Sequence, residues 1–392
     1  MTDISTQAVT AAAGFRAAGV TAGLKASGKS DVAVVVNDGP LQTAALVTTS
    51  NRVFAAPVKW TREVADGSIH AVILNSGGAN AATGAPGYAQ SKATAEHVGA
   101  LLGVPATEIA VCSTGLIGEL LPMDKLLSGA DDAVATLSET GGYDAALAIM
   151  TTDTVPKVAV AENAGVTIGG MAKGAGMLAP AMATMLCVIT TDASIDPETA
   201  QRALDEAIAY SFNRVDSDGA MSTNDTVLLM ASGASGVTPS EEDFTAQLTV
   251  VAKSLARQLI ADAEGASHDI LIRVLEASSQ EAGLAVARAV SRSNLLKAAI
   301  FGNDPNWGRV ISQVGTVSED VAPFDADQLD VAFNGVWVCK AGGLGEDRNL
   351  VDLGANREVI IDINLYAGEE EVELWTNDLT HDYVHENSAY ST

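Results

Sequence analysis

The chain is poor in basic residues, with 22 Lys and Arg against 49 Asp and Glu and a formal net charge of −27. Proteins that bind DNA or RNA need clustered lysines and arginines to contact phosphates, so this balance argues against a nucleic-acid partner. The acidity otherwise bears on solubility and not on the fold. A negatively charged substrate would need basic residues gathered locally, and Lys173 is one candidate.

Long apolar runs and regularly spaced cysteines are also missing. No run reaches the roughly 18 apolar residues that a membrane-spanning helix needs. The first 15 residues carry Asp3 and lack both a basic start and an apolar centre, so they do not resemble a signal peptide. The three cysteines, Cys112, Cys187 and Cys339, are far apart and odd in number, which favours buried, reduced thiols. We therefore expect a cytoplasmic protein without membrane contact.

Metal-binding patterns are absent from the sequence as well. The five histidines show neither HExxH nor paired Cys/His spacing. Asp216, Asp218 and Gly219 resemble the start of a calcium loop, but Val227 stands where such a loop needs a glutamate. We therefore predict no metal site.

What the sequence does contain is typical of a globular α/β protein. Its 392 residues, 47% of them apolar, are enough to bury a large core in more than one domain or lobe. Short apolar runs at 32–36, 71–74 and 109–112 predict buried strands, and residues 88–102, 197–211 and 241–262 predict helices. The glycine-containing residues 1–30 are predicted to be an ordered loop, and Trp307 and Arg309 are predicted to lie in a structural or substrate-lining turn.

The stretch from residue 173 to residue 191, KGAGMLAPAMATMLCVITT, combines a loop with a buried strand. Gly174, Gly176 and Pro180 prevent its first half from continuing a helix or strand. The apolar run at 185–189 predicts a fully buried strand. Thr184 stands at the junction, where its hydroxyl would be held firmly on one side and accessible on the other.

Two interpretations of Thr184 follow from this position. One is an ordinary β-forming residue that opens a core strand. The other is a nucleophile that uses its own α-amine as a base. An α-amine has a pKa of about 7.7–8.0 and is partly neutral near pH 7. An internal threonine gains that amine only when the preceding bond, here Ala183–Thr184, is cut.

Two other strands run into turns of small residues. The strand at 71–74 leads into NSGGAN, and the strand at 109–112 leads into Ser113, Thr114 and Gly115. A threonine followed by glycine can present a hydroxyl and a backbone N–H side by side, and such donors stabilise a developing oxyanion. The alternative is that both segments are ordinary strand-to-helix loops.

Several motifs together resemble one known family. KGAGMLAPAMATML, SNRVFAAPV and FGNDPNWGR are similar to segments of the ornithine acetyltransferase family, the bifunctional glutamate N-acetyltransferases of arginine biosynthesis, and the similarity extends over nearly the whole chain. By this resemblance the chain is identified as an actinobacterial-like member.

The family implies a layered αββα sandwich with a separate C-terminal α+β domain. Residues 1–183 would form an α chain that ends at the self-cleavage site. Residues 184–278 would complete the core, and residues 279–392 would form the C-terminal domain, whose tail enters the active site.

The resemblance also implies a reaction. Thr184 would cleave its own bond to Ala183, and the two chains would stay associated as an α2β2 heterotetramer. The threonine would then carry the acetyl group from N²-acetylornithine to glutamate by ping-pong kinetics, with no metal or organic cofactor. Whether acetyl-CoA also donates an acetyl group stays open. The alternatives are an N-terminal-nucleophile amidohydrolase or aminopeptidase, and a non-enzymatic acidic binding protein.

Site residues are carried over from the family position by position. The oxyanion hole falls on Thr114 and Gly115. The substrate-binding residues are Thr151, Lys173, Thr184, Glu264, Asn387 and Thr392. Lys173 suits a carboxylate and Glu264 the amine of ornithine. The chain departs from the family at His268, where other members often have lysine.

Overall fold

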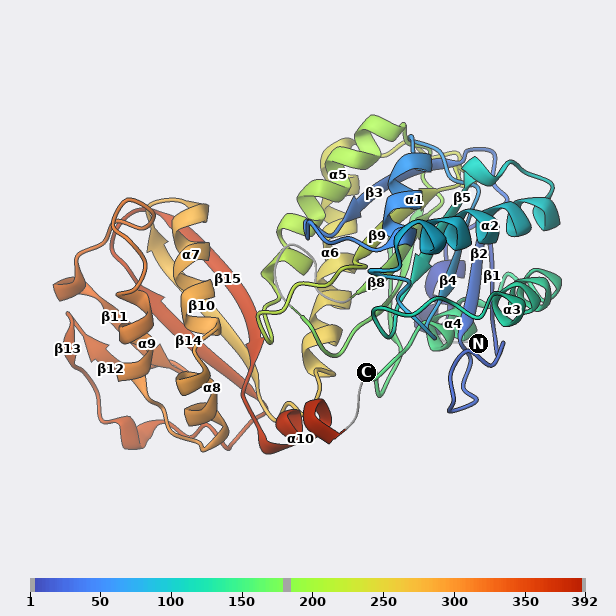
Figure 1. The fold of residues 1–392 in the computed structure, drawn as a ribbon. Coiled ribbons are helices and arrows are strands. Elements are labelled where there is room, and N and C mark those ends of the chain that lie inside the picture. Colours follow the sequence, from blue (N-terminus) through green and yellow to red (C-terminus); the bar gives the residue numbers. More distant parts are fainter. Residues whose placement is uncertain (1–3, 179–184, 390–392) are drawn as a thin grey trace. The chain divides into compact units, whose positions relative to one another are not determined.

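A computed structural model describes residues 4–178 and 185–389, and Figure 1 shows its elements. The chain forms two compact units. Of the described residues, 4–178, 185–213 and 220–262 form the first unit, and 214–219 and 263–389 form the second.

The first unit is built on two sheets. One has the strand order β1 (Phe15–Val20), β2 (Val32–Asn37), β4 (Ala71–Asn75) and β5 (Ile109–Ser113). The other has the order β3 (Thr43–Thr48), β9 (Thr226–Ala231), β8 (Leu186–Thr191), β7 (Val166–Lys173) and β6 (Lys157–Asn163). In each sheet one neighbouring pair is parallel, β4 with β5 and β8 with β9, and the other pairs are antiparallel.

Helices cover the outer faces of both sheets, except for α4, whose side chains belong to the apolar cluster between the sheets. The helices of this unit are α1 (Ala56–Val64), α2 (Gly84–Leu102), α3 (Met123–Ala135), α4 (Gly142–Ala148), α5 (Pro197–Ala209) and α6 (Glu241–Ala261). Side chains of α1, α2 and α3 share an apolar cluster with the first sheet. Helix α5 packs on β3, and α6 packs on β6 and β7. The first unit in Figure 1 therefore has four layers, αββα, which confirms the predicted fold class.

Strand β2 shows why the sequence carries an unbroken apolar run here. Successive side chains of a strand point to opposite faces. Val34 and Val36 pack in the cluster beneath the helices, whereas Ala33 and Val35 pack in the cluster between the two sheets. Because both faces of the strand are covered, every position is apolar.

The second unit is an α+β structure on one sheet. Its strands run in the order β13 (Gly343–Leu344), β12 (Val336–Lys340), β11 (Asp330–Phe333), β14 (Glu358–Asn364), β10 (Asp269–Ala277) and β15 (Glu370–Asn377). Its helices are α7 (Gln280–Ser291), α8 (Asn294–Phe301), α9 (Trp307–Val314) and α10 (His381–Ala389). Side chains of α7, α8 and α9 share one apolar cluster with the sheet.

Short 3₁₀ turns complete the described chain. They are η1 (Ile4–Thr10), η2 (Ala106–Glu108), η3 (Phe212–Arg214), η4 (Ala326–Gln328) and η5 (Arg348–Leu350).

Two local predictions were wrong. The expected N-terminal loop contains β1, which pairs with β2 along its whole length. Gly19 lies within this strand because α4 packs closely on it, so that a Cβ there would lie 2.0 Å from the carbonyl oxygen of Asp144. Trp307 and Arg309, expected in a turn, instead lie in the first turn of α9, which is capped by the Asn306 side chain.

The cysteine prediction is confirmed in part, because Cys112, Cys187 and Cys339 are all buried free thiols. Over residues 4–178 and 185–389, none of the helices combines the length and the apolar character that crossing a bilayer demands.

Candidate active site

Two loops meet where the parallel strands β4 and β5 end. The carboxyl ends of parallel neighbours lie at the same edge of a sheet, where α/β proteins commonly bind ligands. Asn75 pairs with Ser113 in the strand register, and the Ser113 hydroxyl donates to Asn75 Oδ1 at 2.6 Å. The Asn75 amide then donates to the carbonyl of Gly78 at 3.0 Å, and the Gly78 N–H donates to the carbonyl of Thr114 at 3.0 Å. The loops after β4 and β5 therefore form one hydrogen-bonded assembly.

Glycine is required at position 115 of this assembly. Gly115 has a φ of +131°, and a Cβ there would lie 2.7 Å from the backbone nitrogen of Gly78. A side chain would therefore force the two loops apart. Thr114, immediately before it, is buried. The predicted Thr114–Gly115 pair thus lies tightly against the glycine-containing loop after β4.

Lys173 reaches this pair from the second sheet. It is the last residue of β7, it is buried, and its Nζ donates to the Thr114 hydroxyl at 3.3 Å. A hydroxyl that accepts from an ammonium group still has its own proton to donate. The structure therefore brings two predicted site residues together and leaves the Thr114 hydroxyl able to donate a hydrogen bond.

Asp153 organises the third predicted position, Thr151. Its Oδ2 accepts the Thr151 backbone N–H at 2.9 Å and faces the Thr151 hydroxyl at 3.4 Å. Its Oδ1 accepts from Lys157 Nζ at 2.6 Å and from the Gly174 N–H at 2.7 Å. Burial alone would raise the pKa of Asp153, but the charges of Lys173 and Lys157 outweigh it and lower the pKa to about 2. This ionised carboxylate therefore links the Thr151 loop to the end of β7.

A second lysine supports the same loop. Lys25 donates from Nζ to the carbonyl of Ser30 at 2.8 Å and to the carbonyl of Met150, the residue before Thr151, at 2.6 Å. Burial lowers the pKa of Lys25 to about 8, and the charge of Lys173 contributes to this lowering. Two positively charged side chains thus influence each other beside Thr151.

The predicted nucleophile Thr184, its neighbour Ala183 and the substrate-binding Thr392 lie outside the described residues. The next residue after the nucleophile, Met185, is buried. Its N–H donates to Asp225 Oδ1 at 2.9 Å.

Two predicted residues of the second unit also meet. The Asn387 amide on α10 donates to the Glu264 carboxylate at 3.0 Å and to the Tyr383 carbonyl at 3.0 Å. Gly265 allows this approach, because a Cβ there would lie 2.3 Å from the Tyr383 nitrogen. The Thr380 hydroxyl donates to the carbonyl of Gly265 at 2.6 Å. Glu264 and the tail helix are therefore held together.

His268, where the sequence departs from the family, has a partner in the same unit. Its Nδ1 lies 2.8 Å from Asp378 Oδ2, and its backbone N–H donates to Asp378 Oδ1 at 3.0 Å. Ser267 donates to the same carboxylate from its N–H at 2.9 Å and also from its hydroxyl. The bonds from Ser267 and His268 to Asp378 thus fix the turn that leads into β10.

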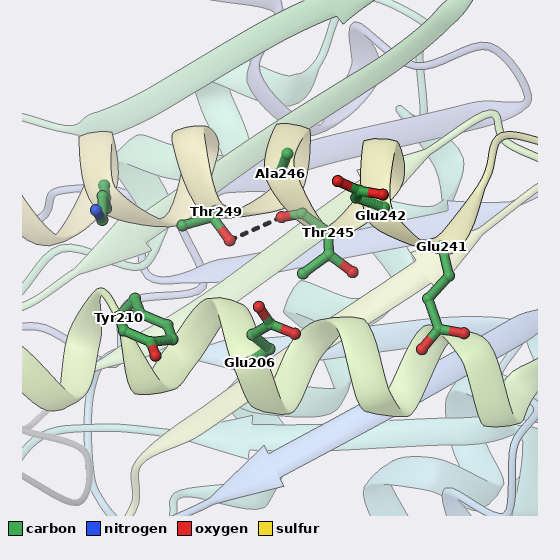
Figure 2. A pocket seen from close by; sticks show the side chains of 8 residues that line it. Glu206, Tyr210, Glu241, Glu242, Thr245, Ala246 and Thr249 are labelled. Carbon is green, nitrogen blue, oxygen red and sulfur yellow. Dashed lines mark hydrogen bonds between the residues drawn. The ribbon is translucent and has the colours of Figure 1, made fainter. Parts of the chain in front are cut away.

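A surface pocket elsewhere in the first unit does not include any of these residues. Figure 2 shows it between α5 and α6, where Thr249 donates to the Thr245 carbonyl at 2.7 Å. The carboxylates of Glu206, Glu241 and Glu242 line it. Lys253 also lines the pocket, but the three carboxylates outnumber it and would repel a carboxylate substrate, so we do not assign the reaction to this pocket.

Over the described part of the chain, no group of three or more His, Cys, Asp or Glu side chains is placed to hold a metal ion. Sequence reasoning missed the roles of Asp153 and Lys25. Neither residue stands in a motif that the sequence analysis identifies. The signal that the sequence offers is that both are charged residues in stretches rich in small residues.

Comparison with known proteins identifies the family. The model of the ArgJ family matches residues 16–392. The arginine biosynthesis bifunctional protein ArgJ of Streptomyces coelicolor is 59% identical over 385 residues, covering 98% of this chain and 100% of the relative. That of Bifidobacterium longum is 57% identical over 390 residues, with the same coverage. A crystal structure of ornithine acetyltransferase complexed with ornithine, from Mycobacterium tuberculosis, is 52% identical, with a TM-score of 0.42, and the match covers 46% of this chain and 97% of that one.

The predicted family is therefore confirmed over nearly the whole length of the sequence. The match begins one residue after Phe15 and includes the loops around Thr114, Lys173 and Glu264. On these grounds the chain belongs to the ArgJ family.

Proposed function

We propose that this protein cleaves itself before Thr184 and then moves the acetyl group from N²-acetylornithine to glutamate. The observation that carries the proposal is the meeting of Thr114, Gly115 and Lys173 where β4, β5 and β7 end. This arrangement offers hydrogen-bond donors for an oxyanion beside a buried positive charge. The coarser statement rests on family membership: the chain is an acetyltransferase enzyme of arginine biosynthesis.

The first proposed event is cleavage of the chain. Thr184 Oγ attacks the carbonyl carbon of Ala183, and the amide becomes an ester as the acyl group shifts from nitrogen to oxygen. Water then opens the ester, which leaves a carboxylate on Ala183 and a free α-amine on Thr184. That amine supplies the base that an ordinary threonine hydroxyl lacks.

Acetyl transfer follows in two steps. The Thr184 amine takes the hydroxyl proton while Oγ attacks the acetyl carbon, and the oxyanion forms against the Thr114 hydroxyl and the Gly115 N–H. Collapse of this intermediate breaks the carbon–nitrogen bond, and the Thr184 ammonium group returns its proton to the departing ornithine amine. The amine of glutamate then attacks the threonine ester, the bond between Oγ and the acetyl carbon breaks, and the Thr184 amine passes the glutamate amine proton to Oγ as N-acetylglutamate leaves. The two half-reactions share one acyl-enzyme.

Charges suit the two substrates. Lys173 and Thr151 are proposed to bind the substrate carboxylate, and their placement by Asp153 supports this role. Glu264 and Asn387 are proposed to bind the side-chain amine of ornithine, and they are already joined by a hydrogen bond. Thr184 and Thr392 complete the proposed set. A related ornithine acetyltransferase has been crystallised with ornithine.

The remaining parts of the proposal concern organisation. We propose an α chain of residues 1–183 and a β chain of residues 184–392, in which 184–278 completes the core and 279–392 forms the C-terminal domain. The two chains would assemble as an α2β2 heterotetramer in the cytoplasm. No metal or organic cofactor enters the proposed steps, and acetyl-CoA would serve as a second acetyl donor if the protein is bifunctional as its relatives are named.

The test is an assay of acetyl transfer in the purified protein. N²-acetylornithine is incubated with and without glutamate, and both N-acetylglutamate and free acetate are measured. Consumption of acetylornithine that requires glutamate and yields N-acetylglutamate supports the proposal. Release of acetate that is independent of glutamate would instead identify an amidohydrolase. A Thr184→Ala variant should be inactive in both assays.

A further inference from the structure

The turn between Ser222 and Asp225 joins the two sheets of the first unit beside the proposed oxyanion hole. The Asn224 amide is buried, and its Nδ2 donates to the carbonyl of Ala79 at 2.6 Å and to the carbonyl of Ser113 at 2.8 Å. One acceptor lies in the loop after β4 and the other is the last residue of β5. A single side chain thus fastens both loops that hold Thr114 and Gly115.

The orientation of this amide is fixed by its neighbours. The Thr223 hydroxyl donates to Asn224 Oδ1 at 2.6 Å, and the Ser222 hydroxyl accepts the Asn224 backbone N–H at 3.1 Å. Because a hydroxyl donates to Oδ1 while Nδ2 faces two carbonyls, the reversed amide would place oxygen against oxygen. The turn therefore supplies both donors in one fixed direction.

Asp225, the next residue, holds the opposite side. Its Oδ1 accepts the N–H of Met185, directly before β8, at 2.9 Å. Asp225 is fully buried, and burial raises its pKa well above the usual range. Two consecutive residues therefore bind different sheets. Asn224 binds the loops of the first sheet, and Asp225 binds the residue before the central strand of the second sheet.

We propose that Asn224 and Asp225 are positioning residues that set the distance between the Thr114–Gly115 loop and Met185. The inference rests on the proposed function, because Met185 directly follows the proposed nucleophile in the sequence. Neither side chain is given a step in the chemistry. They act through the Ser113 carbonyl and the Met185 N–H, which flank the reacting groups in the sequence.

A positioning role has a specific kinetic consequence. Oxyanion donors are used in the transition state and not in ground-state binding, so their displacement lowers kcat without weakening substrate binding. Displacement by about 1 Å can cost roughly 100-fold in rate. We expect Asn224→Ala to lower kcat by roughly 10- to 100-fold, while the dissociation constant for ornithine changes less than about twofold.

Asn37 provides a matched control. Its buried Nδ2 likewise donates to two carbonyls, those of Leu41 at 3.0 Å and Ala231 at 3.2 Å, and so also ties the first sheet to the second. Asn37 stands at the end of β2, beside the beginning of the antiparallel strand β4. The proposed site lies at the opposite end of β4, beyond Asn75. Asn37→Ala should therefore lose stability to a similar extent but keep kcat.

The experiment compares the wild type, Asn224→Ala, Asn37→Ala and Thr223→Val. Self-cleavage is followed by mass spectrometry, melting temperature by calorimetry, ornithine binding by titration calorimetry, and kcat per cleaved chain by the glutamate-dependent assay. Thr223→Val removes the hydroxyl that orients Asn224 and should lower kcat in the same direction, but less. It serves as the readout if Asn224→Ala does not fold.

The outcomes separate the two claims. A selective fall in kcat, or a failure of self-cleavage, in the Asn224 and Thr223 variants but not in Asn37→Ala supports the inference. An active wild type with equal kcat losses in Asn224→Ala and Asn37→Ala, or with none in Thr223→Val, contradicts the inference alone. A wild type without glutamate-dependent transfer contradicts the proposed function, and the inference with it.

Discussion

The carboxylate of Asp153 accepts the backbone N–H of Gly174 at 2.7 Å, across 21 residues of sequence. The same carboxylate accepts the N–H of Thr151, so one buried side chain links the loop of Thr151 to the residue that follows Lys173. Lys157, fully buried, pairs with Asp153 at 2.6 Å and also with Asp262. The geometry of the proposed carboxylate site is thus set by a residue that we do not expect to touch substrate.

Asp153→Asn should weaken both stability and substrate binding. It removes the charge that compensates Lys157 and Lys173, and breaking a buried pair costs roughly 3–5 kcal/mol in the free energy of unfolding. The Km for acetylornithine should rise about tenfold, since a hydrogen bond to a charged group is worth about 1.5–3 kcal/mol. Urea unfolding and initial rates measure the two effects.

Asp192→Asn is the control for this variant. Asp192 is also a buried carboxylate, but it accepts the backbone N–H groups of Thr167 at 2.8 Å and of Ala13 at 3.4 Å. Its replacement should leave Km unchanged. An Asp153→Asn variant with wild-type Km would show that Asp153 does not position Thr151 or Lys173 for binding.

Acid should remove the stabilisation by Asp153 in a defined range. The pKa of its carboxyl is lowered in the folded protein to about 2, from an ordinary value of 3.8. The folded state therefore favours the ionised form, and the stabilisation is complete above pH 3.8 and lost as pH falls towards about 2. The pH dependence of the free energy of unfolding should flatten over this interval in Asp153→Asn. An unchanged slope there would contradict the lowered pKa.

Lys25 should give ligand binding a dependence on alkaline pH. Its pKa is lowered from 10.5 to about 8, so the folded protein loses this positive charge as pH rises through about 8. Binding of a carboxylate beside Lys173 should weaken above that pH, by roughly fivefold for one nearby charge. In Lys25→Met, binding of N-acetylglutamate should be weaker below pH 8 and equal to wild type above it, as measured by calorimetry.

Lys125→Met tests whether this effect arises from charge near the site. Lys125 is exposed, and it donates to the carbonyl of Gly23 at 2.8 Å. Gly23 lies in the loop between β1 and β2, which also contains Lys25. Its loss should leave the pH profile of binding unchanged. If both lysine variants shift the profile equally, the local role of Lys25 is wrong.

Glu264→Gln should separate the two substrates. Glutamine keeps an oxygen that can accept from Asn387, so the tail helix stays anchored while the negative charge is lost. Ornithine binding should weaken about tenfold or more, because its side-chain amine loses a charged partner. Glutamate, whose side chain is a carboxylate, should bind equally well or better. Parallel weakening of both ligands would exclude the proposed contact with the ornithine amine.

Much of the first unit follows from the sequence. The apolar run at 32–36 predicts a strand covered on both faces, and β2 lies between two apolar clusters. The helix predicted at 197–211 corresponds to α5. It begins after Asp196, and the Asp196 side chain caps it by accepting the Thr199 N–H at 2.9 Å. Local periodicity and capping are enough to predict these elements.

Strand β1 was not predictable in the same way. Its sequence, FRAAGV, has few β-branched residues and contains a glycine that is needed only because α4 packs against it. That requirement comes from a segment more than 120 residues away in the sequence. Tertiary packing, and not local propensity, decides its conformation.

The residues of the candidate site differ in the same way in how far the sequence predicts them. Thr114, Gly115 and Lys173 were found through a family resemblance carried by contiguous motifs. Asp153 and Asn224 were not found, because their importance lies in hydrogen bonds that span 21 and 111 residues. No local pattern distinguishes such a side chain from an ordinary turn residue.

The most direct test of the account is the mass of the purified protein under denaturing conditions, followed by N-terminal sequencing of each fragment. We predict that the 40.0 kDa chain separates into two pieces, one of which begins Thr184-Met185-Leu186-Cys187, and that Thr184→Ala stays whole and transfers no acetyl group. A single uncut chain that still moves the acetyl group from acetylornithine to glutamate would contradict the account.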